Sequence, residues 1–378
     1  MKKSNESVFC TLEAEQVCSR TGISRATLYA YVSRGIVRAI AHPEDSRKSL
    51  YDRRDVQSLL DRQSRGRSRQ SVAESTIHWG EPILVSRITR IADGQFYYRG
   101  RNAVELADVM TLEDVAYCLA RIRVTPAKCA STDVIPPDHQ LPFHRMVFTI
   151  TEQVTAQQNI GDGRVAAAKL LRLAALAAAG IGDDGQSAIH QMLAQGWSGS
   201  SKAPELLRRA LVLCADHELN ASTYTVRVAA SAGAVLPACL LAGLSTLSGS
   251  LHGGLTPKCR AWMDQVENEG MDPLQDGLPP GFGHPLYPER DPRAKAIIQA
   301  CGIAGKKSYW TKIACNIYQQ TGVHPSLDFG LALLERQLDL PVGAGLGIFA
   351  LGRMVGWIAH VFEQRETGKL IRPRAIAP

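Results

Sequence analysis

The sequence predicts a mainly α-helical protein with a small basic module ahead of a larger helical region. First, 45% of the 378 residues are hydrophobic and 21% are charged, which is typical of a folded globular protein. Second, alanine- and leucine-rich segments such as 164–179 and 205–214 have helical character, whereas few strand patterns recur. Third, residues 1–70 hold 14 lysines and arginines against 8 acidic residues, while the rest of the chain holds 29 against 28. A local basic excess indicates a polyanionic partner for the first segment.

Residues 11–60 predict two short helices separated by a tight turn. The turn is Thr21-Gly22-Ile23-Ser24, and Ser24 is suited to cap a following helix over 25–33. A helix, a short glycine-containing turn and a second helix form the helix-turn-helix pattern, in which the second helix enters the major groove of DNA. Ser24, Arg25 and Thr27, at the start of that helix, are therefore candidate contacts to phosphates or base edges.

A basic loop follows and strengthens the DNA-binding hypothesis. Arg47, Lys48 and Arg53 surround Tyr51, and such side chains suit backbone phosphates. This part of the chain resembles the winged helix-turn-helix of mercury-resistance-type (MerR) regulators, and the resemblance implies that the loop is the wing and that double-stranded DNA is a partner. The alternative is a small helical module used for dimerisation or packing, with solvated basic residues.

Composition also sets the expected boundaries. Residues 1–62 are the winged helix-turn-helix module, the arginine-rich stretch 63–77 is a basic linker, and 78–378 is the main region. The apolar stretch 228–244 is expected to be a buried core helix, since it contains Gly233 and Pro237, so no membrane partner is expected. The N-terminus has no signal-peptide pattern, and the nine scattered cysteines form no C-x-x-C; these features favour a cytoplasmic protein without a metal site.

In the main region, a strand-like stretch at 82–100 contains Asp93-Gly94, which is a hairpin signal. Beyond it the polar residues able to do chemistry lie in five short clusters. Each has a histidine, aspartate or arginine beside glycine, proline or small residues, which suit a backbone that approaches a ligand. Arginines bind carboxylates, and histidine and aspartate share acid and base roles near neutral pH. The clusters occupy residues 215–223, 249–255, 281–294, 324–330 and 351–375.

In order and spacing these clusters resemble those of the citrate synthase family across residues 78–378. The resemblance implies a mainly helical, two-domain homodimer in which a small domain of roughly 217–330 is inserted into a large one. It also implies condensation of acetyl-CoA, or a related acyl-CoA, with oxaloacetate through an enol, followed by hydrolysis of the thioester. Acetyl-CoA is then a co-substrate, and no other cofactor is implied.

The resemblance assigns roles residue by residue. His252 matches the donor to the thioester oxygen, Asp328 the base that removes the methyl proton, and His284 the group that polarises the oxaloacetate carbonyl. The remaining matches are oxaloacetate ligands: His217, Arg293, Arg353 and Arg372, the last donated across the dimer interface.

The chain departs from the family pattern at four places. Gly253-Gly254-Leu255-Thr256 stands for Gly-Gly-Ala-Asn, and Pro285-Leu286-Tyr287 for Arg-Val-Tyr. The segment Ser326-Leu327-Asp328-Phe329-Gly330 lacks a Tyr-Ser pair, and Cys214 replaces a histidine. No proton-transfer group is lost, and propionyl-CoA or another 2-oxo acid fits the same chemistry. The rival interpretation is a DNA-binding transcriptional regulator that uses the enzyme-like body as a metabolite sensor.

Overall fold

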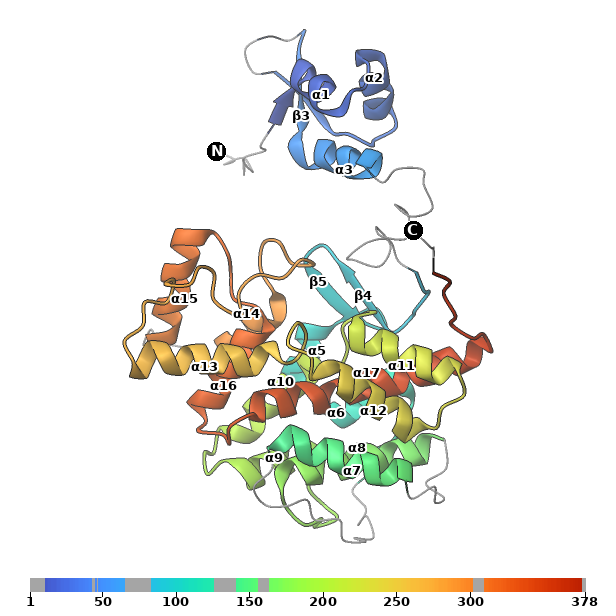
Figure 1. Cartoon of the computed structure of the whole chain (residues 1–378), viewed down its shortest axis with the longest axis vertical. Helices are drawn as coiled ribbons and strands as arrows, with labels where there is room; N and C mark the ends of the chain where they lie inside the picture. Colours follow the sequence, from blue (N-terminus) through green and yellow to red (C-terminus); the bar gives the residue numbers. More distant parts are fainter. Residues whose placement is uncertain are drawn as a thin grey trace. The chain divides into compact units, whose positions relative to one another are not determined.

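A computed structural model describes residues 11–42, 45, 47–64, 83–125, 141–155, 163–301 and 309–375 (Figure 1). The chain divides into two units, Met1–Ile83 together with Arg374–Pro378, and Leu84–Pro373. The predicted linker 63–77 falls within the first unit and lies largely outside the described residues, as does part of the predicted basic loop. The expected domain boundaries therefore stay a prediction.

The described part of the first unit has three helices and a three-stranded antiparallel sheet in the order β1-β3-β2. Ser24 caps the second helix by accepting a hydrogen bond from the amide of Thr27, as the turn sequence predicts. Leu28, Val37 and Tyr51 are fully buried in a small core that belongs to this unit alone. The elements are β1 (Thr11–Glu13), α1 (Ala14–Thr21), α2 (Arg25–Ser33), β2 (Ala39–Ala41), β3 (Ser49–Asp52) and α3 (Arg53–Ser64).

The second unit begins with a small antiparallel sheet, β4 (Thr89–Ala92), β5 (Gln95–Tyr98) and β6 (Arg101–Asn102). Ala92 pairs with Gln95 across a two-residue turn, and Asp93 and Gly94 both have positive φ. This is the turn that Asp-Gly favours in a hairpin, so the predicted hairpin is confirmed.

The rest of the second unit is helical, which confirms the predicted mainly α fold. The first helices are α5 (Ala103–Val109), α6 (Leu112–Ala120), α7 (Pro142–Thr155), α8 (Arg164–Ala179), α9 (Ile189–Trp197) and α10 (Ala203–Cys214). They are followed by α11 (Ala221–Ser231), α12 (Leu236–Leu247), α13 (Leu255–Asn268), α14 (Pro292–Ala300), α15 (Tyr309–Thr321), α16 (Leu327–Gln337) and α17 (Ala344–Thr367).

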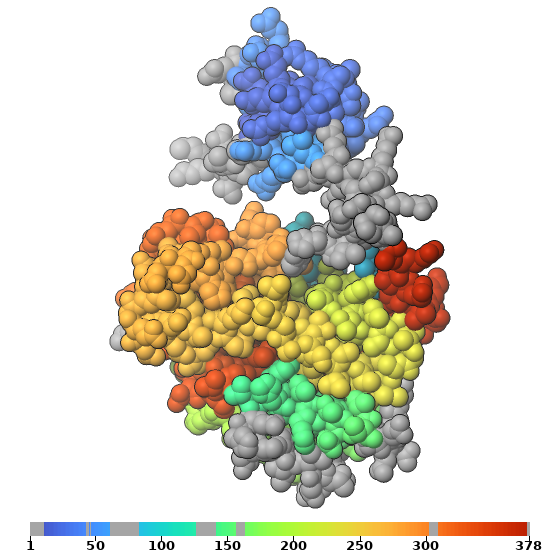
Figure 2. All heavy atoms as spheres, viewed as in Figure 1, coloured from blue at the N-terminus to red at the C-terminus, as the bar shows by residue number. Residues whose placement is uncertain are grey.

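The apolar stretch 228–244 is not one helix. It is divided between α11 and α12, because Gly233 adopts φ +82° and Pro237 lies in the first turn of α12. Both helices are buried in the main core, as expected for a core segment. In Figure 2 they form a surface (yellow) beside the segment that carries α13 to α15 (orange).

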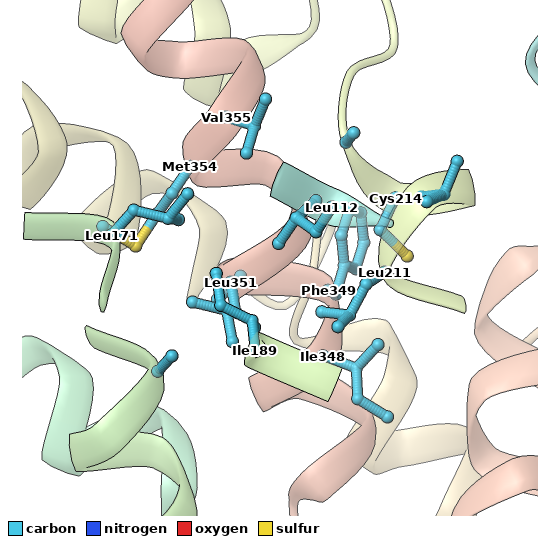
Figure 3. Close-up of a cluster of buried hydrophobic side chains, with 14 of the residues drawn as sticks. Leu112, Leu171, Ile189, Leu211, Cys214, Ile348, Phe349, Leu351, Met354 and Val355 are labelled. Carbon is cyan, nitrogen blue, oxygen red and sulfur yellow. The ribbon is translucent and has the colours of Figure 1, made fainter. Parts of the chain in front are cut away.

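Helix α17 is the central element of the second unit. It is long and apolar enough to cross a membrane, because a stretch of 18 residues within it has a mean hydropathy of 1.4. However, 89% of that stretch is buried inside the protein. Its side chains Ile348, Leu351 and Met354 point into the cluster that also holds Leu171 and Leu211 (Figure 3). A helix that is apolar on all sides is a core helix when other helices surround it.

A second cluster of buried side chains lies between residues 259 and 333, on α13, α15 and α16. Trp262, Phe282, Trp310 and Phe329 are its aromatic members. Helices α11 and α12 pack instead with the main core, although the expected small domain of 217–330 includes them. The functional side chains described next come from segments of both clusters.

Candidate active site

Two glycines bring α17 against the last turn of α10 and the residues that follow it. A Cβ on Gly352 would lie 2.7 Å from the Leu211 carbonyl oxygen, and one on Gly356 would lie 2.5 Å from that of Ala215. Real side chains do not tolerate these distances, so only glycine permits this approach. As a result, Arg353, which follows Gly352, faces the loop that carries His217.

The Arg353 guanidinium is fully buried but only partly satisfied. Its Nε donates a hydrogen bond to the Cys214 carbonyl at 2.9 Å, and its carbon lies 5.0 Å from the centre of the Phe349 ring. Its Nη2 is buried and has no hydrogen-bond partner among the residues that the structure describes. Burial lowers the pKa of Arg353, yet an arginine stays charged in proteins. An unsatisfied buried cation is costly, and an anionic ligand would supply the missing acceptor.

Arg293 is a second buried guanidinium, held by its neighbour Asp291. Nε and Nη2 of Arg293 donate to the two carboxylate oxygens of Asp291 at 3.0 and 2.8 Å. Burial lowers the pKa of Arg293, but the charge of Asp291, the hydrogen bond to it and the nearby Tyr287 together raise this pKa above its usual value. Asp291 also accepts a hydrogen bond from the amide of Leu327 at 3.0 Å, which fixes the start of α16 beside this pair.

Three aromatic side chains meet beside Arg293. His217 Nε2 lies 2.8 Å from the Tyr287 hydroxyl, and the His217 and His284 rings are 5.4 Å apart, edge to face. His284 Nδ1 accepts a hydrogen bond from the amide of Leu286 at 3.2 Å, so the neutral ring carries its proton on Nε2. Burial and then Arg293 lower the pKa of His284 to about 4, and the same causes place the pKa of His217 well below its usual value. Both rings are neutral at pH 7.

His252 lies in the loop between α12 and α13. Its Nε2 is 2.8 Å from the hydroxyl of Ser222, which is fully buried in the first turn of α11. Burial, followed by the charge of Arg353, lowers the pKa of His252 to about 4. The Ser222 hydroxyl donates its one proton to Asn220 Oδ1 at 2.7 Å, so with that bond in place the Nε2–H of neutral His252 donates to Ser222 Oγ. If the hydroxyl turns to donate to Nε2, the ring proton lies on Nδ1 and is offered to a ligand.

Asp328 is the second residue of α16, and Thr256 lies on the neighbouring helix α13. The Thr256 hydroxyl donates to Oδ1 of Asp328 at 2.6 Å. Burial raises the pKa of Asp328 to about 6, although this hydrogen bond lowers it. A carboxylate with such a pKa is ionised at pH 7 and is a stronger base than an exposed one.

A backbone bridge brings the His284 and Asp328 segments together. Phe282 pairs with Pro325, the amide of Gly283 donates to the His324 carbonyl, and the amide of Ser326 donates to the Gly281 carbonyl. Gly281 has φ +87°, and a Cβ there would lie 2.7 Å from Cys259 Sγ. The glycines of GFGH therefore serve the close approach of these two segments.

The structure thus brings together six of the seven predicted site residues of the main region. The charges of Arg293 and Arg353 both act on His217, as do the rings of His284 and His252. The charge of Arg293 also lowers the pKa of Asp328. The seventh, Arg372, is exposed after the end of α17, where the amide of Ile371 donates to Ser231 Oγ at 3.0 Å. Its role across a dimer interface stays a prediction.

The sequence analysis missed several partners of these groups. Asp216 directly precedes His217, and the helix that follows, α11, is capped by Asn220. Asp216 is fully buried and lies 3.4 Å from Nε2 of buried His360 on α17. Burial raises the pKa of Asp216, but His360 and Arg353 lower it more. Asp291, Tyr287, Ser222 and Thr256 were also missed, and only the D-x-R spacing of Asp291 and Arg293 gave a local signal.

The predicted DNA contacts lie in the first unit. Arg25 is exposed and forms a 2.8 Å ion pair with Glu15, and Ser24 Oγ lies 2.9 Å from Thr27 Oγ1. Arg47 and Lys48 are exposed in the hairpin between β2 and β3. Arg53 is exposed at the start of α3. Their role in DNA binding stays a prediction. Among the described residues, no group of three or more histidine, cysteine, aspartate or glutamate side chains is placed to hold a metal ion.

Comparison with known proteins identifies the family of the second unit. The sequence model of the citrate synthase C-terminal domain matches residues 143–374. A citrate synthase of Haloferax volcanii is 39% identical over 186 residues, which are 45% of this chain and 49% of that protein. A 2-methylcitrate synthase of Shewanella oneidensis is 32% identical over 209 residues, 51% of this chain and 56% of that protein. The chain thus spans about half the length of the curated relatives it matches.

Solved structures show the same fold. The crystal structure of citrate synthase from Thermotoga maritima has a TM-score of 0.64 and 25% identity, covering 79% of this chain and 94% of that one. A second structure is a ternary complex of carboxymethyl coenzyme A and oxaloacetate with the Thermoplasma acidophilum citrate synthase. It has a TM-score of 0.66 and 20% identity, and the match covers 82% of this chain and 96% of that one. Since the family model matches more than half of the chain, this protein belongs to the citrate synthase family.

Proposed function

We propose that the chain is a citrate-synthase-type enzyme that condenses acetyl-CoA, or a related acyl-CoA, with oxaloacetate and hydrolyses the product thioester. The observation that carries this proposal is a buried guanidinium, Arg353, with an unsatisfied nitrogen, close to Arg293, three neutral histidines and a basic carboxylate. Two cations suit a dianionic 2-oxo acid, and the other groups suit enol chemistry.

Arg353 and Arg293 bind the carboxylates of oxaloacetate and orient its ketone. His217 adds a polar contact, and its hydrogen bond to Tyr287 fixes its ring. The Nε2–H of His284 donates to the ketone oxygen, because its Nδ1 is occupied by the amide of Leu286. This donor polarises the carbonyl and then gives its proton to the alkoxide.

Asp328 removes a proton from the methyl group of acetyl-CoA. The electrons move onto the thioester oxygen, which takes the Nδ1 proton of His252 as the enol forms and returns it to His252 when the enol carbon attacks. His252 carries this proton on Nδ1 once the Ser222 hydroxyl turns from Asn220 to donate to Nε2. The enol carbon then bonds to the ketone carbon of oxaloacetate. Water hydrolyses the resulting citryl thioester, which releases citrate and CoA.

The test is consumption of the thioester by purified protein, followed by its ultraviolet absorbance and by mass analysis of the product. Loss of thioester that requires both acetyl-CoA and oxaloacetate supports the proposal. Propionyl-CoA is tested as a second acyl-CoA substrate in the same assay, because one relative is a 2-methylcitrate synthase. No consumption with any acyl-CoA and 2-oxo acid would overturn the proposal.

Activity is expected to depend on pH through Asp328. The carboxylate must be ionised to act as a base, and burial raises its pKa to about 6. The value of kcat/KM should therefore fall as pH decreases through about 6, with one proton taken up. The three histidines stay neutral above this range, since the pKa values of His252 and His284 are lowered to about 4 and that of His217 lies well below its usual value. Measurement between about pH 5 and 8 checks this; a flat profile down to pH 5 contradicts it.

We also propose, as the resemblance implies, that the protein is a cytoplasmic homodimer in which Arg372 reaches the partner's site. Arg372 is exposed and not engaged by a described acidic group, which leaves it able to reach another copy. Sedimentation of the purified chain tests the dimer, and a monomer at all concentrations contradicts it.

A second candidate function, binding of double-stranded DNA by the first unit, is favoured by its geometry. Helix α2 has an exposed N-terminal turn capped by Ser24, and a basic hairpin with Arg47 and Lys48 follows it. Helix N-termini and exposed cations suit phosphates. The ion pair between Arg25 and Glu15 is solvent-exposed and therefore weak enough to be exchanged for a phosphate. This function is compatible with catalysis and with ligand sensing by the second unit.

DNA affinity should fall about tenfold or more between about 50 and about 200 mM salt, as ions are released from the phosphates. The double variant Arg47→Ala/Lys48→Ala should bind about tenfold more weakly, with a smaller salt slope. Lys169→Ala/Lys312→Ala removes the same charge from exposed positions on α8 and α15 and is the matched control. Gel shifts with the full chain measure both; equal binding by the two double variants contradicts the role of the hairpin.

A further inference from the structure

We infer that Thr256 is a positioning residue that holds the Asp328 carboxylate for proton removal, a role that rests on the proposed function. Thr256 belongs to the segment Gly253-Gly254-Leu255-Thr256, in which this chain departs from the family pattern it resembles. The departure therefore lies in direct contact with the proposed base.

The hydrogen bond selects one oxygen of the carboxylate. Thr256 Oγ1 donates to Asp328 Oδ1 at 2.6 Å, a short distance that is typical of a hydroxyl bonded to an ionised oxygen. This contact fixes the rotation of the carboxylate and leaves Oδ2 to take the substrate proton. A base that is held in place reacts faster than one that rotates, because less ordering is needed in the transition state.

The threonine is itself held by packing. Only 1% of its surface is exposed, and it lies in the first turn of α13. Its methyl group lies close to α17, since a Cβ on Gly345 would be 3.0 Å from Thr256 Cγ2. The amide of Gly345 is bonded to buried Glu335 at 2.8 Å, so this part of α17 is fixed as well. The hydroxyl is thus aimed at α16 by its contact with α17.

The hydroxyl also sets the basicity of Asp328. The charged and titratable groups that act on this carboxyl are Arg293 and Asp291 beside α14, with Cys259 on α13 and Cys214 at the end of α10. Burial raises the pKa of Asp328, and the Thr256 hydrogen bond is the largest influence that lowers it. Loss of this hydroxyl should therefore reduce the ionised fraction near neutral pH.

The test compares Thr256→Val with Thr256→Ser in the full chain. Valine keeps the shape and removes the hydroxyl, whereas serine keeps the hydroxyl and removes the methyl group. For Thr256→Val we expect kcat at pH 7 to fall about tenfold, and the acidic limb of the kcat/KM profile to move up by about one pH unit. With acetyl-CoA deuterated at the methyl group, its isotope effect on kcat should increase. Thr256→Ser should stay within about threefold of the unmodified chain and keep its profile.

The outcomes separate this inference from the proposed function. Thioester consumption by the unmodified chain establishes the function before the variants are compared. The positioning role is overturned if the unmodified chain is active and Thr256→Val has the same pH profile and the same isotope effect as that chain. This holds even when kcat of the variant falls. Equal losses in the valine and serine variants also overturn it, because packing alone would then explain them. Oxaloacetate binding by each variant, measured by calorimetry, should be unchanged.

Discussion

Asp328→Asn is expected to lower kcat for thioester consumption by about a thousandfold, because it removes the base that takes the methyl proton. The amide oxygen still accepts the hydrogen bond from Thr256, so the local geometry is preserved. Oxaloacetate binding, which we propose to depend on Arg293 and Arg353, should change by less than about twofold. The two effects are separated by steady-state kinetics and by calorimetric titration with oxaloacetate.

Asp276→Asn is the matched control, since it makes the same change at an exposed position outside the site. It should retain full activity. Two results would contradict the assignment of Asp328 as the base: kinetics of Asp328→Asn equal to those of the control, or a loss confined to KM for oxaloacetate. The second would place Asp328 among the ligands of the 2-oxo acid.

The residues that we propose to transfer protons could be singled out from the sequence because each lies in a short local pattern. His284 follows two glycines with positive φ, and Asp328 follows the segment that pairs with them. Their order along the chain is enough for the family resemblance. The expected hairpin at Asp93-Gly94 is predictable for the same reason, since two adjacent residues determine the turn.

The partners of these groups could not be predicted, because they are distant in sequence and common in type. Thr256 and Asp328 are 72 residues apart, and Asp216 and His360 are 144 apart. Nothing local to a threonine after two glycines indicates which carboxylate it will meet. Such contacts depend on how three or four helices pack, which periodicity alone does not give.

The division of 228–244 into two helices shows another limit. Continuous hydrophobicity predicts burial, and both helices are buried. Hydrophobicity does not indicate where a buried chain turns. The turn depends on Gly233 and Pro237, whose effects are local and are hidden by apolar neighbours.

The second large effect is expected for Gly356→Ala, because α17 packs closely against Ala215 and Asp216 at this glycine. The added methyl carbon would lie 2.3 Å from Asp216 Oδ1 and 2.5 Å from the Ala215 carbonyl oxygen. The amide of Gly356 donates to that carbonyl at 2.9 Å, so the backbone itself would have to separate. We expect the free energy of unfolding to fall by about 3 kcal/mol, the upper part of the range for overpacking.

The same displacement should reach the site, because Ala215 and Asp216 directly precede His217, and Arg353 lies one helical turn from Gly356. Gly182→Ala is the control: Gly182 is exposed, has open space around its Cβ position and lacks a positive φ, so its unfolding midpoint should barely change. Thermal unfolding followed by circular dichroism, with and without oxaloacetate, measures both variants. Ligand stabilisation should be weaker in Gly356→Ala, since a ligand raises the midpoint only as far as it binds the folded state. Equal midpoints for the two variants would contradict the close contact between Gly356 on α17 and the residues before His217.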